Sequence, residues 1–170
     1  LQSYAFAVPT SLYSSIPNAK TVTCEFMAET YSGTTLVGTS NVVDATFTAT
    51  GNPVINSTSA VDTNSTTTAL TGNSSKIVKY ASKMKVTVAA KPQNSSTIKT
   101  ITINGTAATL STSSGVTTGV LTITNPSSST YNVVVTDSRG YTTSKSVTIA
   151  SSNFINYVPL TISNYAVVRN

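Results

Sequence analysis

The sequence predicts an all-β protein. Ser and Thr make up 59 of the 170 residues, and Thr and Val favour strands, whereas helix formers such as Glu and Leu are scarce. Several segments alternate apolar and polar residues with a period of two, which is the pattern of strands that bury one face. Only 9% of the residues are charged, but 39% are hydrophobic, so the chain can bury a core and does not resemble a disordered polymer.

The clearest element is a β-hairpin over residues 131–149. Its first strand places Val133 and Val135 on one face, and its second strand alternates in the same way. Between the arms, Asp137 suits the first position of a turn because its carboxylate can accept hydrogen bonds from backbone amides two residues on. Gly140 supplies a positive φ without a Cβ clash.

Residues 1–50 are predicted to form the C-terminal part of a first β-sandwich module. We expect residues 10–16 to make one helical turn that plugs a sandwich end with Leu12 and Ile16. The expected strands lie at residues 1–8, 21–31, 36–38 and 42–50. These are too few for a closed sandwich, so the missing strands would lie upstream of the chain or come from another chain.

Residues 51–150 are predicted to form a complete Ig-like antiparallel β-sandwich module. Gly-Asn-Pro at residues 51–53 marks its start, because three chain breakers follow one another. Asn104 and Gly105 form the strongest short hairpin signal. With the hairpin at 131–149, about seven strands over roughly 100 residues suit this fold. The other expected elements are an edge strand at 53–55, a polar loop at 63–75, and strands at 83–89, 98–103, 106–110 and 119–124.

Residues 151–170 are predicted to be a linker and the start of a further module, or a partner-docking segment. Residues 159–163 repeat the character of residues 53–57, about 106 positions earlier. This repeat favours tandem sandwich modules on one string.

The chemistry-bearing side chains do not predict an active site. The chain has no histidine, which excludes the common Ser-His-Asp and zinc sites. Glu25 and Glu29 would lie about 13 Å apart along one strand, beyond the ~5–9.5 Å of a glycosidase pair. Whether Asp44 and Asp62 meet in space is left open by the sequence, and Asp137 is explained by its turn. We therefore expect no enzyme, no catalytic residue, no metal site and no cofactor.

The net charge is +5, with a sequence pI of about 9.4. The chain has only two arginines, and they are far apart in the sequence. No set of base-reading side chains is therefore present, and we expect no nucleic-acid partner. A weak attraction for anionic cell-wall polymers is a more plausible use of the charge. No apolar run approaches 18 residues, so we expect no membrane partner. The only basic cluster consists of Lys76, Lys79, Lys83 and Lys85.

Cysteine, sequons and tyrosines add little about function. Cys24 is the only cysteine, so an intrachain disulfide is impossible, and its strand position predicts a small buried hydrophobe. The number of Asn-x-Ser/Thr sequons equals what chance gives at this Ser and Thr content, so they do not predict glycosylation. The sequons begin at Asn56, Asn64, Asn73, Asn94 and Asn104. Tyr13, Tyr31 and Tyr80 lie near expected loops and could stack on sugars.

Several stretches, taken in order, are similar to one known family. They are Phe6-x-Val8-Pro9-x(7)-Pro17-Asn18, the segments 29–38, 83–88 and 96–99, and the segment 133–140 leading into 144–149. Together they resemble minor structural proteins of tailed phages and prophages of Gram-positive bacteria, which are built from tandem Ig-like or fibronectin-like modules. The similarity covers most of residues 4–163 and departs from the family at 54–75. Its motifs are turn and strand signatures, so no functional residue can be carried over.

The resemblance implies a virion component of the tail, tail tip or a fibre that acts as a structural spacer or contacts the host cell surface. Its partners would be other virion proteins, its own copies, or host cell-wall polysaccharide. Two alternatives stay open. One is a bacterial surface adhesin or stalk built of the same repeats, and the other is a carbohydrate-binding module of a larger protein.

Overall fold

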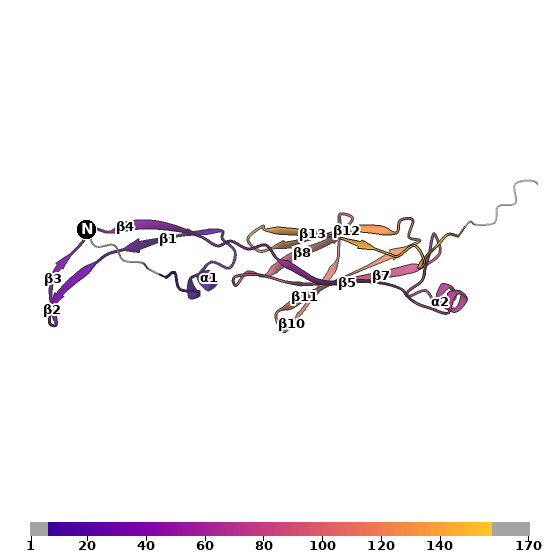
Figure 1. The fold of residues 1–170 in the computed structure, drawn as a ribbon, viewed down its shortest axis with the longest axis horizontal. Coiled ribbons are helices and arrows are strands. Elements are labelled where there is room, and N and C mark those ends of the chain that lie inside the picture. The colour runs from indigo at the N-terminus through magenta and orange to yellow at the C-terminus, as the bar shows by residue number, and fades with distance from the viewer. Residues whose placement is uncertain (1–6, 158–170) are drawn as a thin grey trace, which may run out of the picture.

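The structure, a computed structural model, describes residues 7–157. Most of these residues lie in strands, which confirms the all-β prediction. Two parts follow one another along the long axis of the molecule (Figure 1). We call residues 7–50 the arm and residues 51–157 the body.

The arm consists of one short helix and one long, interrupted β-hairpin. Strand β1 pairs with β4, and β2 pairs with β3 nearer the tip. The strand predicted over residues 21–31 is thus two strands, and Ala28 and Ser40 bond across the break, through the Ala28 N–H to the Ser40 hydroxyl at 2.9 Å and the Ser40 N–H to the Ala28 carbonyl at 2.8 Å. The elements are α1 (Ser11–Ser15), β1 (Thr21–Phe26), β2 (Glu29–Ser32), β3 (Thr35–Thr39) and β4 (Val43–Thr48).

The predicted helical turn is confirmed by α1, although Thr10 makes no side-chain capping bond. The strand predicted over residues 1–8 falls mostly outside the described residues, and the two described positions, Ala7 and Val8, are not in a strand. Within the described part, the arm hairpin pairs with no further strand. A two-stranded ribbon is at best marginally stable alone, so the arm depends on contacts beyond its own ladder.

The body is formed by two four-stranded antiparallel sheets. Their strand orders are β10-β11-β7-β5 and β13-β12-β8-β9, and at the end away from the arm β14 pairs in parallel with β6. The strands are β5 (Val54–Asp62), β6 (Ile77–Val78), β7 (Lys83–Lys91), β8 (Ile98–Ile103), β9 (Thr106–Ala107), β10 (Thr109–Ser113), β11 (Val116–Thr124), β12 (Thr130–Asp137), β13 (Thr142–Thr148) and β14 (Phe154–Ile155). The predicted hairpin over residues 131–149 is thus confirmed as β12 and β13.

One core holds the two sheets together. Strand β7 alternates buried residues with exposed or half-buried ones along its length, and its buried side chains join those of β8 and β12 in a single cluster. Burying each large aliphatic side chain contributes roughly 1.5–3 kcal/mol. Gly119 on β11 lies against Ile101 of the other sheet, where a Cβ would come within 3.0 Å of the isoleucine side chain. Glycine therefore permits the close approach of the sheets at this point.

The Asn104-Gly105 turn is confirmed, since both residues have positive φ, 47° and 80°, as a tight two-residue hairpin requires. The single strand predicted over residues 106–110 is instead divided. Strand β9 pairs with β8 and β10 pairs with β11, so the chain crosses from one sheet to the other near Ala108.

The polar loop predicted over residues 63–75 is wrong, because this segment contains helix α2 (Ser65–Thr71). The side chain of Asn64 caps the helix by accepting from the Thr66 N–H at 3.0 Å, and Gly72 ends it in a left-handed conformation. The hydroxyls of Thr68 and Thr71 bond to carbonyls four residues earlier. Threonine is a weak helix former, so the composition of this segment does not predict a helix. The helix is instead delimited by its capping residues, Asn64 and Gly72.

A buried carboxylate anchors the end of the body where α2 lies. Asp62 is 3% exposed, and its two oxygens accept four hydrogen bonds. The donors are the backbone N–H groups of Asn64 and Lys83 and the hydroxyls of Thr67 and Ser82. Burial raises the pKa of Asp62, but these bonds outweigh burial and hold the pKa below its usual value.

We predict that Asp62→Ala lowers the free energy of unfolding at pH 7 by about 2–4 kcal/mol, because four donors lose their acceptor. The lowered pKa means that the ionised carboxylate stabilises the fold above its ordinary pKa of about 4. This contribution disappears as the pH falls through the lowered folded-state pKa. Urea denaturation of both proteins between pH 7 and pH 2 measures the difference, which should narrow on the acid side. A gap that stays constant with pH would contradict the assignment.

Candidate interaction site

One side chain of the body makes three of the hydrogen bonds that join the body to the arm. Arg139 lies in the turn between β12 and β13 and is only 6% exposed. Its guanidinium donates hydrogen bonds to four backbone carbonyls, three of them in the arm. The acceptors are Ile16 and Ala19 for Nε, both at 3.1 Å, Tyr13 for Nη2 at 3.1 Å, and Gln93 for Nη1 at 3.2 Å. We call this arrangement the arginine clamp.

The turn that presents Arg139 is built on Asp137, as the sequence predicts. One carboxylate oxygen of Asp137 accepts from the backbone N–H of Arg139 at 3.0 Å and of Tyr141 at 2.8 Å. Gly140 completes the turn with a φ of 81°. Asp137 is fully buried, and its other oxygen has no hydrogen-bond partner among the described residues.

Further polar contacts surround the clamp. The Ser138 hydroxyl donates to the Pro17 carbonyl at 2.6 Å and accepts from the Thr97 N–H at 3.0 Å. The ammonium of Lys20 lies 4.7 Å from the centre of the Tyr141 ring, a cation–π contact. The junction between arm and body is therefore held mainly by hydrogen bonds from the body to arm carbonyls.

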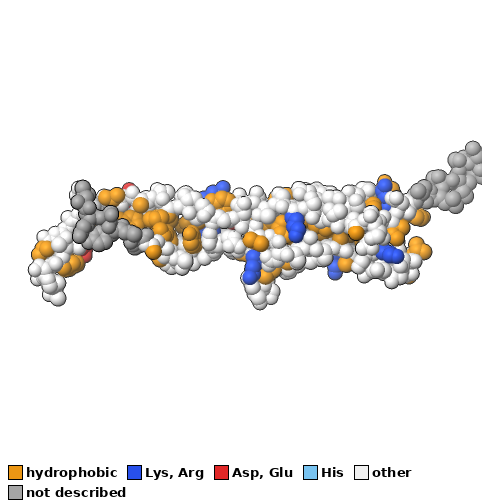
Figure 2. All heavy atoms as spheres, viewed as in Figure 1, with side chains coloured by type: hydrophobic (Ala, Val, Ile, Leu, Met, Phe, Trp, Pro, Cys, Tyr) orange, Lys and Arg blue, Asp and Glu red, His pale blue; other side chains and the backbone are white. Residues whose placement is uncertain are grey.

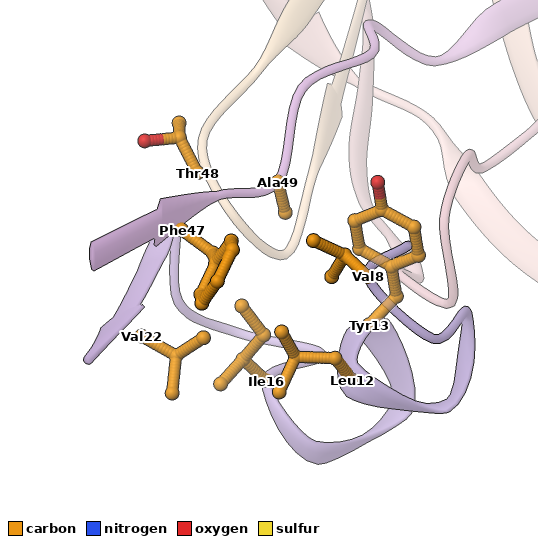
Figure 3. A pocket seen from close by; sticks show the side chains of 8 residues that line it. All are labelled: Val8, Leu12, Tyr13, Ile16, Val22, Phe47, Thr48 and Ala49. Carbon is orange, nitrogen blue, oxygen red and sulfur yellow. The ribbon is translucent and has the colours of Figure 1, made fainter. Parts of the chain in front are cut away.

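The apolar contacts of α1 lie within the arm itself. Leu12 and Ile16 point toward Val22 and Phe47 of the hairpin (Figure 3). They enclose a hollow of about 130 Å³, which Val8 also lines. A small-molecule pocket typically measures ~300–1,000 Å³, so this hollow is a packing feature. The helical turn is present, but its expected role as a plug over a sandwich end is wrong. Leu12 and Ile16 cover the arm hairpin, and the carbonyls of Tyr13 and Ile16 face the body.

Beyond the junction, the arm leaves large hydrophobic side chains exposed. Six of the eleven such side chains in the described structure fall between residues 27 and 43, which is a small part of the chain. They are Met27, Tyr31, Leu36, Val37, Val42 and Val43. Single exposed apolar residues are ordinary, whereas contiguous exposed patches are typical of contact surfaces, so the arm is a candidate for one.

The arm is also acidic. Glu25, Glu29 and Asp44 are all exposed, and Glu25 lies directly opposite Asp44 in the β1–β4 register. Like charges in such a pair are destabilising. The Tyr31 hydroxyl donates to the Glu29 carboxylate at 2.6 Å, and this bond raises the pKa of Tyr31.

The structure does not bring Asp44 and Asp62 together, because Asp44 lies in the arm and Asp62 ends β5 beside α2. Among residues 7–157, no three metal-ligating side chains form a group. In the same range, no helix is long and apolar enough to cross a membrane. Cys24 is half-buried and lines a second apolar hollow with Phe26 and Phe47, as expected for a small hydrophobe.

The molecule is thus an elongated all-β protein whose arm exposes large hydrophobic side chains. The sequence matches, over residues 1–170, the family described as "Siphovirus protein of unknown function (DUF859)", and the chain belongs to that family. It is therefore a phage protein, and membership favours association with the virion. Neither a curated protein nor a solved structure gives a significant match.

Sequence reasoning treated Arg139 as an isolated cation and missed the clamp. Its acceptors in the arm lie 120 to 126 positions away along the chain and are backbone carbonyls, which any residue provides. The only available signal was an arginine within a tight Asp-Ser-Arg-Gly turn, where a long side chain with several hydrogen-bond donors extends from the end of a hairpin.

We predict that Arg139→Ala frees the segment around α1, because four carbonyls lose their donor. Trypsin reports this directly, since the only Lys or Arg between residues 1 and 75 is Lys20. Cleavage after Lys20 should accelerate at least about tenfold, the factor that 1.4 kcal/mol of lost stabilisation produces. Arg139→Lys should be intermediate, because an ammonium lacks the planar fork.

Lys145→Ala, which removes an exposed lysine of β13, is the matched control and should leave the rate unchanged. Mass spectrometry of the fragments 1–20 and 21–170 follows the cut. A wild-type cleavage rate in Arg139→Ala would show that the clamp does not hold the arm.

Proposed function

We propose that this chain is a non-enzymatic structural module of a phage virion, associated with the tail or with a fibre. It would act as a spacer, as a contact with the host cell surface, or as both. The observation that carries the proposal is the clamped junction, which makes the arm and the body one extended unit with contact surface left on the arm. Family membership supports the phage setting.

We infer that the body is an Ig-like sandwich, the kind of module that phage structural proteins string together. Its strand order supports this inference. Across one sheet the neighbouring strands are β5, β7, β11 and β10, and across the other they are β13, β12 and β8 with the short β9 at the edge. This is the ABED and CFG division of Ig-type domains. The first β-sandwich module and the further module after residue 151 remain proposals of the same kind.

The composition suits a spacer. Exposed faces of the strands are rich in Thr and Ser, which pair across the ladder, as Thr23 does with Thr46 at 3.2 Å and Thr130 with Thr148 at 3.5 Å. Such hydroxyl pairs add cross-strand stabilisation to the sheet without using charged side chains. The proposed partners are other structural proteins of the virion, further copies of this chain, and host cell-wall polysaccharide. A Gram-positive host is part of the same proposal.

Immunogold electron microscopy with an antibody to residues 51–150 tests the proposal. It should label purified phage particles at one fixed position, because a structural module occupies a defined place in the virion. The control is the same antibody after absorption with the purified chain, which should remove the label. Label on uninfected, prophage-free cells with none on particles would overturn the proposal and favour a bacterial surface adhesin.

A further inference from the structure

The two ends of the molecule both expose large hydrophobic side chains. The arm carries one set near its tip, and the other set lies at the opposite end of the body, around α2 and the end of the described chain (Figure 1). We call the latter region the far end. The side chains are Leu36, Val37 and Val43 on the arm and Leu70, Tyr80 and Tyr157 at the far end, each between 45% and 76% exposed.

The same two ends carry opposite charge. Residues 21–48 of the arm contain three exposed carboxylates and neither Lys nor Arg. The body has two carboxylates, Asp62 and Asp137, and both are buried in internal hydrogen bonds. Four of its lysines cluster toward the far end, at positions 76, 79, 83 and 85. In the view of Figure 2, basic side chains appear along the body and at the far end, while the arm shows acidic ones.

The arm also carries an electrostatic cost that a cationic partner would remove. Glu25 and Asp44 face one another across the β1–β4 ladder, and carboxylates in directly opposite positions repel. No lysine or arginine within residues 21–48 can offset this repulsion. A partner that places ammonium groups over this pair would gain Coulomb energy while covering the neighbouring apolar side chains.

We propose that copies of this chain associate head to tail, with the arm of one copy seated on the far end of the body of the next. Arm-to-arm contact would set three carboxylates against three, which complementary interfaces avoid. A contact between different surfaces does not close on itself in a pair, so it propagates as a string or closes as a ring. The biological use of this association rests on the proposed structural role, but the association itself would be a property of the purified chain.

Sedimentation of the purified chain tests the contact apart from its place in the virion. At low ionic strength the average mass should rise above 17.6 kDa as the concentration increases. In about 1 M salt, where the Debye length is about 3 Å, it should fall back toward the monomer value. A monomer at every concentration and salt level would overturn the proposal, and would leave the virion location untouched.

Charge reversal identifies the two surfaces. The arm variant carries Glu25→Lys, Glu29→Lys and Asp44→Lys, and the far-end variant carries Lys79→Glu, Lys83→Glu and Lys85→Glu. Each should remain monomeric by itself, because like charges then meet at the contact. An equimolar mixture should associate again, since each variant offers the other a complementary end.

The matched control carries Lys91→Glu, Lys99→Glu and Lys145→Glu, which change the net charge by the same amount at exposed positions outside the far-end cluster. It should associate like the wild type, and thermal unfolding should show all three variants folded. An arm variant that still associates alone, or a mixture that stays monomeric, would overturn the proposal. The first result would indicate an arm-to-arm or purely apolar contact instead.

Discussion

The arginine clamp is the interaction on which the arrangement of the molecule depends. A two-stranded ribbon is at best marginally stable in water, and the apolar face of α1 covers only one side of it. The guanidinium of Arg139 supplies the missing attachment with donors that reach three arm carbonyls. Arginine suits this position because its planar group stays charged and holds five donors in a fixed fork. A buried cation is costly, and carbonyl dipoles at hydrogen-bond distance offset that cost.

Two buried carboxylates organise the two ends of the body. Asp137 shapes the turn that faces the arm, and Asp62 ties β5, α2 and the start of β7 together at the far end. Both act by collecting backbone N–H groups rather than by pairing with a cation. A consequence follows for the surface. Because both carboxylates of the body are buried, the charged side chains on its exterior are all basic. The exposed carboxylates of the described chain all lie in the arm.

This asymmetry connects the fold to the proposed role. A clamped, extended unit transmits its orientation from one end to the other, which a spacer in a virion requires. Its strand faces rely on hydroxyl pairs more than on charge, so the few charged groups stand out against a neutral surface. The ends differ in sign while sharing exposed apolar side chains, and such a unit is suited to join others in one direction.

The sequence by itself determined the elements whose signals are local. Period-two alternation located most strands of the body, Asp137 and Gly140 specified their turn, and Asn104-Gly105 specified another, because each depends on neighbouring residues alone. Threonine-rich composition misled over α2, where the capping residues and not the helix interior carry the information. Only the tertiary structure decided the role of Arg139, the separation of Asp44 from Asp62, and the opposite character of the two ends. The clamp joins Arg139 to carbonyls 120 to 126 positions away along the chain. The other two features depend on the path of the chain in space, which no local pattern encodes.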